Sequence, residues 1–363
     1  MARVVFDNVS KHFGSVKAVD EVSFDISEGE FICLLGPSGC GKTTTLRLLA
    51  GLEQPTSGRI SIGDRDVTDA KPKERDVGMV FQDYALFPHM TIAENIAYPL
   101  KVRGVGAHDR HARAEEVARS LGIELLLARR PGQISGGQQQ RTSVARAVVH
   151  KPQVFLFDEP LSNLDAKLRV EARSFLKHLQ TELGVTAVYV THDQAEAMAL
   201  ADRIAVMESG RVVQMGAPLD VYRRPATTFV ASFLGSPPMN LLPVGLELRN
   251  GGAVLRHDGF HVDVSGWREG LAQRFRDGDS LTLGVRPEHL QLAPAEADAT
   301  VTGEVYTLEP LGPETLITCM IDGRLITARL FGDEPPALGK VAHFRVDPAH
   351  LDLFDEAGNR IAL

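Results

Sequence analysis

A glycine-rich loop between a buried strand and a helix constrains the fold of this chain more than any other feature. The continuous apolar run Phe31–Leu35 is typical of a strand buried on both faces of a parallel sheet. The apolar spacing further on predicts a helix over 43–50, with Gly51 as its C-terminal glycine. Between them, Gly36–Thr43 reads Gly-Pro-Ser-Gly-Cys-Gly-Lys-Thr, which matches the phosphate-loop pattern. This order predicts an α/β fold that binds a nucleotide.

The residue types in this loop suit phosphate binding. Glycines let consecutive backbone N–H groups turn inward as an anion nest, and the helix start adds the positive end of its dipole. Lys42 would reach the β and γ phosphates, and the Thr43 hydroxyl would ligate Mg²⁺. A glycine-rich turn that matches by chance is the alternative, and the flanking strand and helix weigh against it. The residues expected to hold the nucleotide are Gly36, Pro37, Ser38, Gly39, Cys40, Gly41, Lys42, Thr43 and Thr44.

Two further predicted strands end in polar residues. Val154–Phe157 runs into Asp158 and Glu159, and Ala187–Val190 is followed after one threonine by His192. Open α/β sheets place their ligands at the carboxyl ends of strands. Asp158 can hold Mg²⁺ there, and Glu159 can polarise the attacking water. Because buried strands that end in acids are common, this motif is weak alone, and it gains weight from the Ile134–Gln138 segment that precedes it.

Periodic apolar positions predict helices over Arg110–Leu126, Gln138–His150 and Ala166–Leu183, and a mostly helical insert over about 86–152. A serine and two glycines open the helix of Gln138–His150 and make another anion-binding helix start. A simple helix cap is the alternative. Since the chain has a single Mg²⁺-type acid, we expect this second start to serve the nucleotide of another copy. Its residues are Ser135, Gly136, Gly137 and Gln138.

The character of the chain changes after Leu234. Gly235–Pro238 is a turn-rich junction, and short alternating runs such as Ser280–Val285 follow it. Further runs lie at Leu316–Ile321 and Leu325–Ala328, and turn signals lie at Asn250-Gly251, Asp258-Gly259 and Asp322-Gly323. We expect a separate, mostly β domain over 236–363, in the form of a barrel. The first domain then spans 1–235.

Composition excludes several classes of protein. The chain has 363 residues, 44% apolar and 24% charged, which are near the averages for globular proteins and suggest two or three domains. Acidic residues outnumber basic ones 47 to 39, so no overall positive field gathers nucleic acid. Cys33, Cys40 and Cys319 lack disulfide or zinc spacing, which favours a reducing compartment. No signal peptide or membrane-spanning stretch is expected, so work at a membrane would require another chain.

Together these motifs resemble the ATP-binding subunits of ABC transporters. The resemblance rests on the phosphate loop and on Ile134–Gln138, Asp158–Pro160, Leu161–Asp165 and Thr191–Asp193. Gly235–Asn240 and Gly284–His289 are similar to importer ATPases of the maltose and glycerol-3-phosphate type. The resemblance spans almost the whole chain, although Ile134 stands where leucine is usual, a swap of similar volume. It implies an ABC-type P-loop ATPase domain with a helical subdomain, followed by an OB-like barrel regulatory domain.

The resemblance also implies roles for single residues. Phe13 stands where these ATPases stack an aromatic ring on adenine, and Gln82 where a glutamine contacts Mg²⁺ and the attacking water. Glu159 resembles the general base, and His192 the switch residue that contacts the γ phosphate. Asp165 resembles the aspartate that signals across the dimer. Without the family, a core phenylalanine, a polar cap and a structural histidine would be the simpler readings of Phe13, Gln82 and His192.

The resemblance implies an ATPase that uses ATP and Mg²⁺, lies at the inner face of the cell membrane and forms a homodimer around two ATP molecules. It would drive uptake through two integral-membrane permease subunits, serve a solute-binding protein indirectly and bind no nucleic acid. A sugar or glycerol phosphate is the expected solute, whereas polyamine and iron importers share the same ATPase. The 236–363 domain disfavours an exporter ATPase. The absence of coiled coils and tandem copies disfavours an ABC-type ATPase of DNA repair or translation.

Two segments carry additional expectations. Cys40 lies beside Lys42 at a helix start, which favours a reactive thiolate, so we expect alkylation to abolish hydrolysis and MgATP to protect. The run Gln82–Met90 follows the predicted catalytic glutamine with aromatic and apolar residues. We expect it to receive a short helix of the permease near Leu86 or Phe87. Burial under the chain's own helical insert is the alternative.

Overall fold

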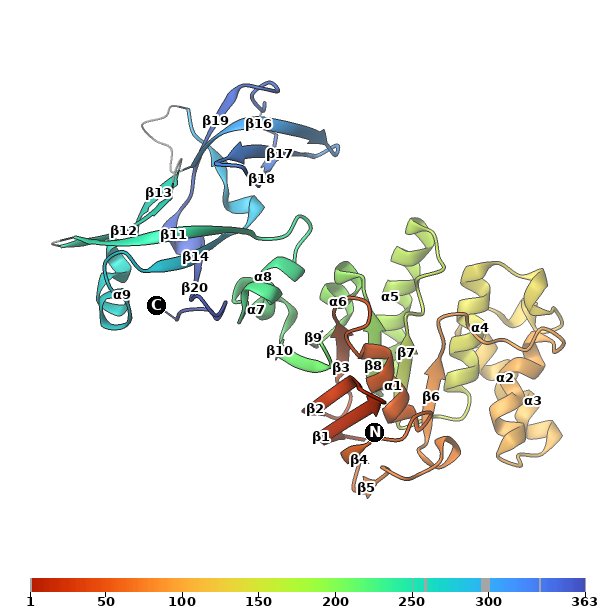
Figure 1. Cartoon of the computed structure of the whole chain (residues 1–363). Coiled ribbons are helices and arrows are strands. Elements are labelled where there is room, and N and C mark those ends of the chain that lie inside the picture. The colour runs from red at the N-terminus through yellow and green to blue at the C-terminus, as the bar shows by residue number, and fades with distance from the viewer. Residues whose placement is uncertain (1, 250, 258–259, 295–300, 333, 363) are drawn as a thin grey trace. The chain divides into compact units, whose positions relative to one another are not determined.

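The computed structural model describes residues 2–249, 251–257, 260–294, 301–332 and 334–362 (Figure 1). Contacts divide the chain into two compact units, Met1–Leu219 and Asp220–Leu363. This division falls before the junction at Gly235–Pro238, because helix α8 (Thr228–Phe233) packs with the second unit. Among the described residues, no helix is both long and apolar enough to cross a membrane.

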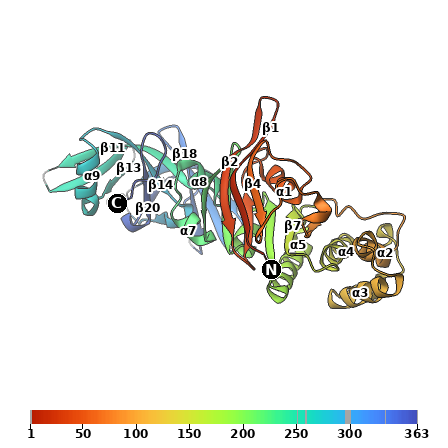
Figure 2. The same ribbon diagram turned by 90° about the horizontal axis from the view of Figure 1, so that it is seen from below.

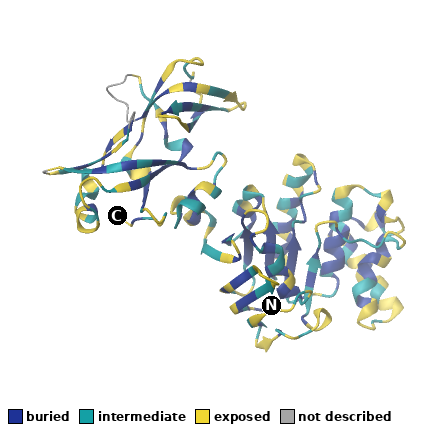
Figure 3. Ribbon diagram, in the orientation of Figure 1, coloured by how far each residue is buried: buried dark blue, intermediate teal, exposed yellow. Residues whose placement is uncertain are grey.

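The core of the first unit is a sheet with the strand order β10-β9-β3-β8-β7-β6. Its strands from β9 to β6 pair in parallel, and β10 is antiparallel to β9. Every residue of β3, β7 and β8 is buried, as the continuous apolar runs predict (Figure 3). The strands are β3 (Phe31–Leu35), β6 (Val77–Val80), β7 (Val154–Asp158), β8 (Thr186–Thr191), β9 (Arg203–Glu208) and β10 (Arg211–Gly216).

A second, antiparallel sheet lies in the same unit, with the strand order β2-β1-β4-β5. Its apolar face shares a core with α1 and the parallel sheet, so the two sheets enclose the helix that follows the phosphate loop. The strands are β1 (Val4–Phe13), β2 (Val16–Ile26), β4 (Ser57–Ile62) and β5 (Arg65–Asp66). The helices of the core are α1 (Lys42–Ala50), α5 (Ala166–Leu183) and α6 (Gln194–Leu200).

The predicted helical insert consists of α2 (Ile92–Val102), α3 (Ala107–Ser120) and α4 (Gly136–Val148), which lie together in both views (Figures 1 and 2). The helix predicted over Arg110–Leu126 ends earlier than expected, at Ser120. Gly122 adopts a left-handed φ of 66°, which ends the helix, and Leu125 beyond it is 88% exposed. The apolar residues keep a helical spacing beyond Ser120, although the helix itself ends there.

The second unit begins within α7 (Pro218–Arg223), which α8 follows. It continues as a strongly curled antiparallel sheet, half of a barrel. The strand order is β15-β19-β16-β13-β12-β11-β14-β20, and the hairpin of β17 and β18 extends from β16. The strands are β11 (Asn240–Arg249), β12 (Gly252–His257), β13 (Phe260–Asp263), β14 (Ser280–Val285), β15 (Gln291–Leu292), β16 (Val301–Pro310), β17 (Glu314–Ile321), β18 (Arg324–Phe331), β19 (Val341–Arg345) and β20 (Leu351–Phe354), with α9 (Arg268–Arg274) between β13 and β14.

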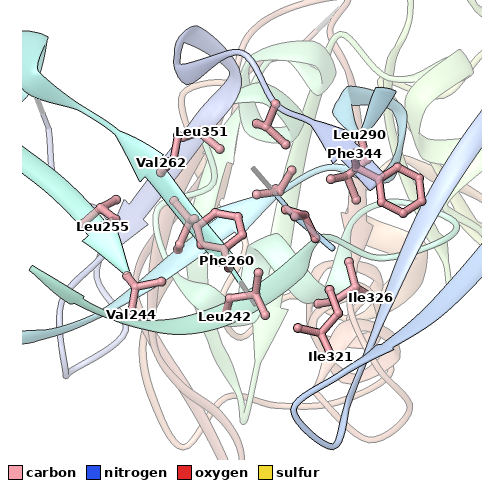
Figure 4. Packing of buried hydrophobic residues seen from close by; sticks show 14 of the residues in the cluster. Leu242, Val244, Leu255, Phe260, Val262, Leu290, Ile321, Ile326, Phe344 and Leu351 are labelled. Carbon is pink, nitrogen blue, oxygen red and sulfur yellow. The ribbon is translucent and has the colours of Figure 1, made fainter. Parts of the chain in front are cut away.

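Side chains from the concave face of this sheet form one core. Leu242, Leu255, Phe260, Ile326 and Phe344 meet there from five different strands (Figure 4). Alternate residues of β11 and β18 point into it, which is the period-two burial that an antiparallel sheet requires.

One of the predicted turns lies between β17 and β18. Asp322 and Gly323 both take positive φ there, at 44° and 71°, as a two-residue hairpin turn requires. Asn250 and the pair Asp258-Gly259, which were also expected to form turns, lie outside the described residues.

Candidate functional site

A pocket of about 410 Å³ lies where the phosphate loop faces the carboxyl ends of β7 and β8. It gathers residues that are far apart in the sequence, because parallel pairing of β3, β8 and β7 brings their carboxyl ends to one edge. Its lining includes all three side chains predicted to act in catalysis, Gln82, Glu159 and His192. The lining residues are Ala18, Ser38, Gly39, Gly41, Lys42, Thr43, Thr44, Gln82, Glu159 and His192.

The glycines of the phosphate loop are needed for space and conformation. Gly41 has a φ of 105°, and a Cβ added to it would lie 2.3 Å from the carbonyl oxygen of Ala18. A Cβ on Gly36 would lie 2.4 Å from the carbonyl oxygen of Met207. Both contacts are far too short for a side chain, so only glycine allows the loop to pack this closely against β2 and β9.

The Lys42 side chain is buried and held by the loop itself. Its Nζ donates to the carbonyl oxygens of Gly36 at 2.7 Å and Pro37 at 2.9 Å. These bonds satisfy a buried ammonium group that would otherwise be costly. They also fix the ammonium at the pocket, where a phosphate oxygen can become an additional acceptor.

Thr43 and Asp158 form a pair of oxygen donors behind the loop. The Thr43 hydroxyl donates to Oδ1 of Asp158 across 3.3 Å, and the carboxylate is buried. Burial raises the pKa of Asp158, and the hydrogen bond from Thr43 opposes that rise. A buried carboxylate beside a hydroxyl is suited to accept a metal cation.

Glu159 and His192 meet across the same edge. Oε2 of Glu159 lies 3.0 Å from Nδ1 of His192, and Glu159 is largely buried while His192 is exposed. The backbone of Glu159 is left-handed, with a φ of 44°, and its N–H donates to the carbonyl of Val190 at 3.0 Å. Unfavourable backbone geometry of this kind often marks functional positions, because the surroundings must hold it in place.

Gln82 reaches the pocket from the segment that leaves β6. Its carbonyl oxygen accepts a hydrogen bond of 2.9 Å from the Asn163 side chain, which lies in the loop after Glu159. The main chain at Gln82 is therefore tied to the same loop that carries Glu159. Sequence reasoning did not single out Asn163, although it lies inside the Leu161–Asp165 motif.

Other predicted nucleotide residues lie outside the pocket lining. Ser135 is the N-cap of α4, and its Oγ and the Gln138 side chain bond reciprocally to each other's backbone N–H groups. Asp165 is the exposed N-cap of α5 and accepts from the backbone N–H of Leu168 at 2.9 Å. Phe13 is 48% exposed at the end of β1, with Nζ of Lys11 lying 4.8 Å from its ring centre. Gly136 and Gly137 are the first two residues of α4. The predicted nucleotide residues outside the pocket lining that lie at the ends of helices or strands are therefore Phe13, Ser135, Gly136, Gly137, Gln138 and Asp165.

Cys40 differs from the expectation of ready alkylation. Its side chain is only 3% exposed and packs in the core between the two sheets, 3.6 Å from Nζ of Lys42. Cys40 is not among the residues that line the pocket, so its thiol is not exposed there. Cys33 and Cys319 are also buried, and neither forms a disulfide.

A groove of about 620 Å³, here called the insert groove, lies between the parallel sheet and the insert. Phe81, Ala85 and Phe87 contribute to it from the predicted docking segment and its neighbour, whereas Leu86 does not, and Tyr84 is buried. Most of its lining is apolar. The full lining is Pro72, Lys73, Val77, Gly78, Met79, Phe81, Ala85, Phe87, Tyr98, Pro99, Val102, Arg103, Arg146, Ala147 and His150.

Three family models match the chain. The chain matches the family model described as ABC transporter over residues 19–162, the MalK OB fold domain over 235–290 and the TOBE domain over 283–354. The OB match confirms the predicted OB-like architecture of the second unit.

Similar proteins extend over the whole chain. The sulfoquinovosyl glycerol transport ATP-binding protein SmoE of Agrobacterium fabrum is 46% identical, over 99% of each chain. The sn-glycerol-3-phosphate import ATP-binding protein UgpC of Chromohalobacter salexigens is 47% identical, over 100% of this chain and 97% of that one.

The first unit is also similar to a solved structure. The dimeric ATP-binding cassette MJ0796, in a post-hydrolysis state with ADP and Pi, is 34% identical with a TM-score of 0.54, over 59% of this chain and 98% of that chain. Full-length relatives at this level of identity, together with the phosphate loop and its pocket, establish the family. The chain belongs to the ABC transporter family, and it is an ATP-hydrolysing subunit of the importer type with a C-terminal OB and TOBE region.

Proposed function

We propose that two copies of this chain close around two ATP molecules and that hydrolysis drives uptake of a sugar or a glycerol phosphate through two permease subunits. One observation carries the proposal. Lys42, Thr43, Gln82, Glu159 and His192 line one pocket, whereas the anion-binding helix start at Ser135–Gln138 lies outside its lining. Because this second helix start lies outside the pocket lining, it is suited to bind the nucleotide of a second copy.

The residues of the pocket divide the work of hydrolysis. The loop N–H groups and Lys42 bind the β and γ phosphates and stabilise negative charge as the terminal bond breaks. Glu159 takes a proton from the attacking water, and His192 holds the γ phosphate in line with that water. Gln82 orients the water. The contact between Glu159 and His192 holds the side chains of the base and the switch residue in a fixed position relative to each other.

The oxygen donors at the pocket fit Mg²⁺. Thr43 and Asp158 supply a hydroxyl and a buried carboxylate, and Gln82 can add an amide oxygen. Among the described residues there is no group of three or more His, Cys, Asp or Glu side chains that could hold a metal, which suits an ion held largely by phosphate oxygens and water. When bound, Mg²⁺ would neutralise phosphate charge during transfer.

Residues at the element ends complete the site in the dimer. Ser135, Gly136, Gly137 and Gln138 close over the partner's γ phosphate, and Asp165 connects the two sites. The exposed ring of Phe13 stacks on adenine, because only an open π face is required. ATP binds the closed dimer more tightly than the open one, so binding closes it and loss of phosphate reopens it.

The membrane partners dock at the insert groove. Its apolar lining suits a short amphipathic helix of a permease, and Phe87 is the residue of the docking segment that lines it with an aromatic ring. The protein then lies at the inner, cytoplasmic face of the membrane, bound through the permeases. Names of relatives that transport glycerol phosphate and a sulfoquinovosyl glycerol favour a sugar or glycerol phosphate over polyamine or iron.

An ATP-dependent dimer tests the core of the proposal. Glu159→Gln keeps the size of the side chain and removes the base, so hydrolysis should fall by about 100-fold or more while ATP still binds. Size-exclusion chromatography of this variant with MgATP should show a dimer that is absent without nucleotide. Lys42→Ala is the matched control, because it loses phosphate affinity and should remain monomeric. A Glu159→Gln protein that turns over ATP like the wild type would contradict the mechanism.

A further inference from the structure

The segment that carries Gln82 contains a turn that its own residues do not favour. Tyr84 and Ala85 both adopt left-handed backbone conformations, with φ of 61° and 46°. Left-handed backbone is unfavourable for residues other than glycine, and two in succession are unusual. Within the turn, the Asp83 side chain accepts from the Ala85 N–H at 3.2 Å, and contacts from elsewhere in the chain must add to this one local bond.

Arg146 of α4 supplies those contacts. Its Nη1 donates to the carbonyl oxygen of Ala85 at 2.6 Å, and its Nη2 donates to that of Tyr84 at 2.7 Å. Ser143, one turn earlier on α4, donates its hydroxyl to the same Tyr84 oxygen at 3.0 Å. The guanidinium is planar, so bonds to two successive carbonyls fix the orientation of both peptide groups.

The surroundings of Arg146 restrict its side chain to contacts with the turn and with Phe87. Arg146 is 8% exposed, and its guanidinium donates both of its hydrogen bonds to main-chain oxygens of the turn. Its carbon Cζ also lies 5.8 Å from the ring centre of Phe87, within range of a cation–π contact. A buried cation that bonds the main-chain oxygens of one turn has a positional role.

The turn lies two residues after Gln82, between two other anchors. Before it, the Gln82 carbonyl accepts from Asn163 of the catalytic core. After it, the N–H and carbonyl of Phe87 bond to the Asn95 side chain of α2. Between these anchors, the path of the chain depends on whether Tyr84 and Ala85 stay left-handed.

We infer that Arg146 is a positioning residue for hydrolysis: by fixing the left-handed turn at Tyr84 and Ala85, it sets the position of Gln82 in the pocket. The inference rests on the proposed role of Gln82 and extends it to a residue that does not line the pocket. Because α4 begins at the helix start that faces the partner's ATP, this bond also ties the position of Gln82 to the position of that helix.

Arg146→Lys is the central test. Lysine keeps the charge but cannot bond both carbonyls in one plane, so the turnover of ATP by the purified chain should fall about 10- to 100-fold, as for a misplaced catalytic group. The KM for ATP should change less than the turnover, since the loop N–H groups and Lys42 bind the phosphates wherever Gln82 lies. Arg141→Lys is the matched control on the same helix. Arg141 bonds the carbonyl of Leu121 at 3.2 Å and lies over Phe175, far along the chain from the turn, so its turnover should stay near that of the wild type.

A second substitution separates positioning from packing. Glycine accepts left-handed backbone without strain, so Ala85→Gly added to Arg146→Lys should restore turnover by about threefold or more. Loss of packing around the guanidinium would not be repaired by removing one methyl group. If Arg146→Lys fails to fold, Ser143→Ala takes its place, with an expected fall of about threefold from the loss of one of the bonds to Tyr84.

Three outcomes would overturn the inference: wild-type turnover in Arg146→Lys, an equal fall in Arg141→Lys, or no gain from Ala85→Gly. Gln82→Ala keeps this failure distinct from failure of the proposed function. If Gln82→Ala hydrolyses ATP at the wild-type rate, the role proposed for Gln82 is wrong. If Gln82→Ala is slow while Arg146→Lys is normal, only the positioning role of Arg146 is wrong.

Discussion

Nδ1 of His192 lies 3.0 Å from Oε2 of Glu159, although the two residues are 33 positions apart in the chain. They follow β7 and β8, which pair in parallel with Asp158 opposite Val190. Parallel pairing therefore places the residue after each strand at the same edge. The contact joins the proposed base to the proposed switch residue.

This contact predicts that Glu159 and His192 act as one unit. Glu159→Gln and His192→Ala should each lower turnover by about 100-fold, and the double variant should be little slower than the slower single variant. Residues that act independently would instead multiply their effects, to about 10,000-fold. Steady-state ATPase assays of the four proteins measure the difference. Multiplied effects would show that the 3.0 Å contact has no part in catalysis.

The burial of Cys40 predicts slow alkylation of the native protein. All three cysteines are buried, so maleimide should label none of them rapidly in the folded chain and all three after unfolding in guanidinium. Mass spectrometry of the labelled protein counts the modified thiols. Rapid labelling of native Cys40, prevented by MgATP, would contradict the buried position of its side chain.

His150 predicts a loss of stability in mild acid. Burial lowers its pKa to about 4, from about 6.5 in the unfolded chain. As the pH falls from 6.5 to 4, the unfolded chain gains a proton on this residue that the folded chain does not, so folding stability falls. The difference between the two pKa values corresponds to roughly 3 kcal/mol across this window. Urea unfolding at a series of pH values measures this change in folding stability.

His150→Gln removes this proton uptake and should flatten the dependence of stability on pH between 6.5 and 4. His178→Gln is the matched control, because the His178 side chain is 81% exposed, beside Glu182 on α5. The control should follow the wild-type curve. Parallel curves for wild type and His150→Gln would show that His150 is protonated in the folded protein.

The contacts of Arg286 predict at which residue a stable fragment of the second unit must begin. Its buried guanidinium donates to the carbonyls of Tyr222, Ala231 and Leu234, and its Cζ lies 3.9 Å from the Tyr222 ring centre. A fragment that begins at 236, the boundary expected from the sequence, loses all of these partners. A fragment that begins at 220 keeps them and should be more stable by about 3 kcal/mol, since buried donors without partners are costly.

Urea unfolding of the two fragments measures this difference. Arg286→Leu should reduce the difference in stability between the two fragments, because an apolar side chain at this position leaves no buried donor to satisfy. A difference unchanged by Arg286→Leu would assign the stability of the longer fragment to α7 and α8 themselves. Equal stability of the two fragments would support a boundary at 235.

The sequence by itself determined the elements whose pattern is local. The bounds expected for Phe31–Leu35, Ala166–Leu183 and Ser280–Val285 agree with β3, α5 and β14, because burial on both faces, helical amphipathicity and strand alternation are each written into consecutive residues. The phosphate loop is local in the same sense. Its spacing predicted an α/β nucleotide-binding fold without help from any other segment, and the resemblance to a family then nominated Phe13, Gln82, His192 and Asp165.

Only the tertiary structure decided which of these residues meet. The contact of Glu159 with His192 depends on the pairing of β7 with β8, and the bonds from Arg146 to the turn after Gln82 depend on the packing of α4 against that loop. The burial of the Cys40 side chain depends on the packing of the two sheets around it. These features join residues far apart in the chain, and no local pattern specifies such contacts, because they form only when the sheet and the insert pack together.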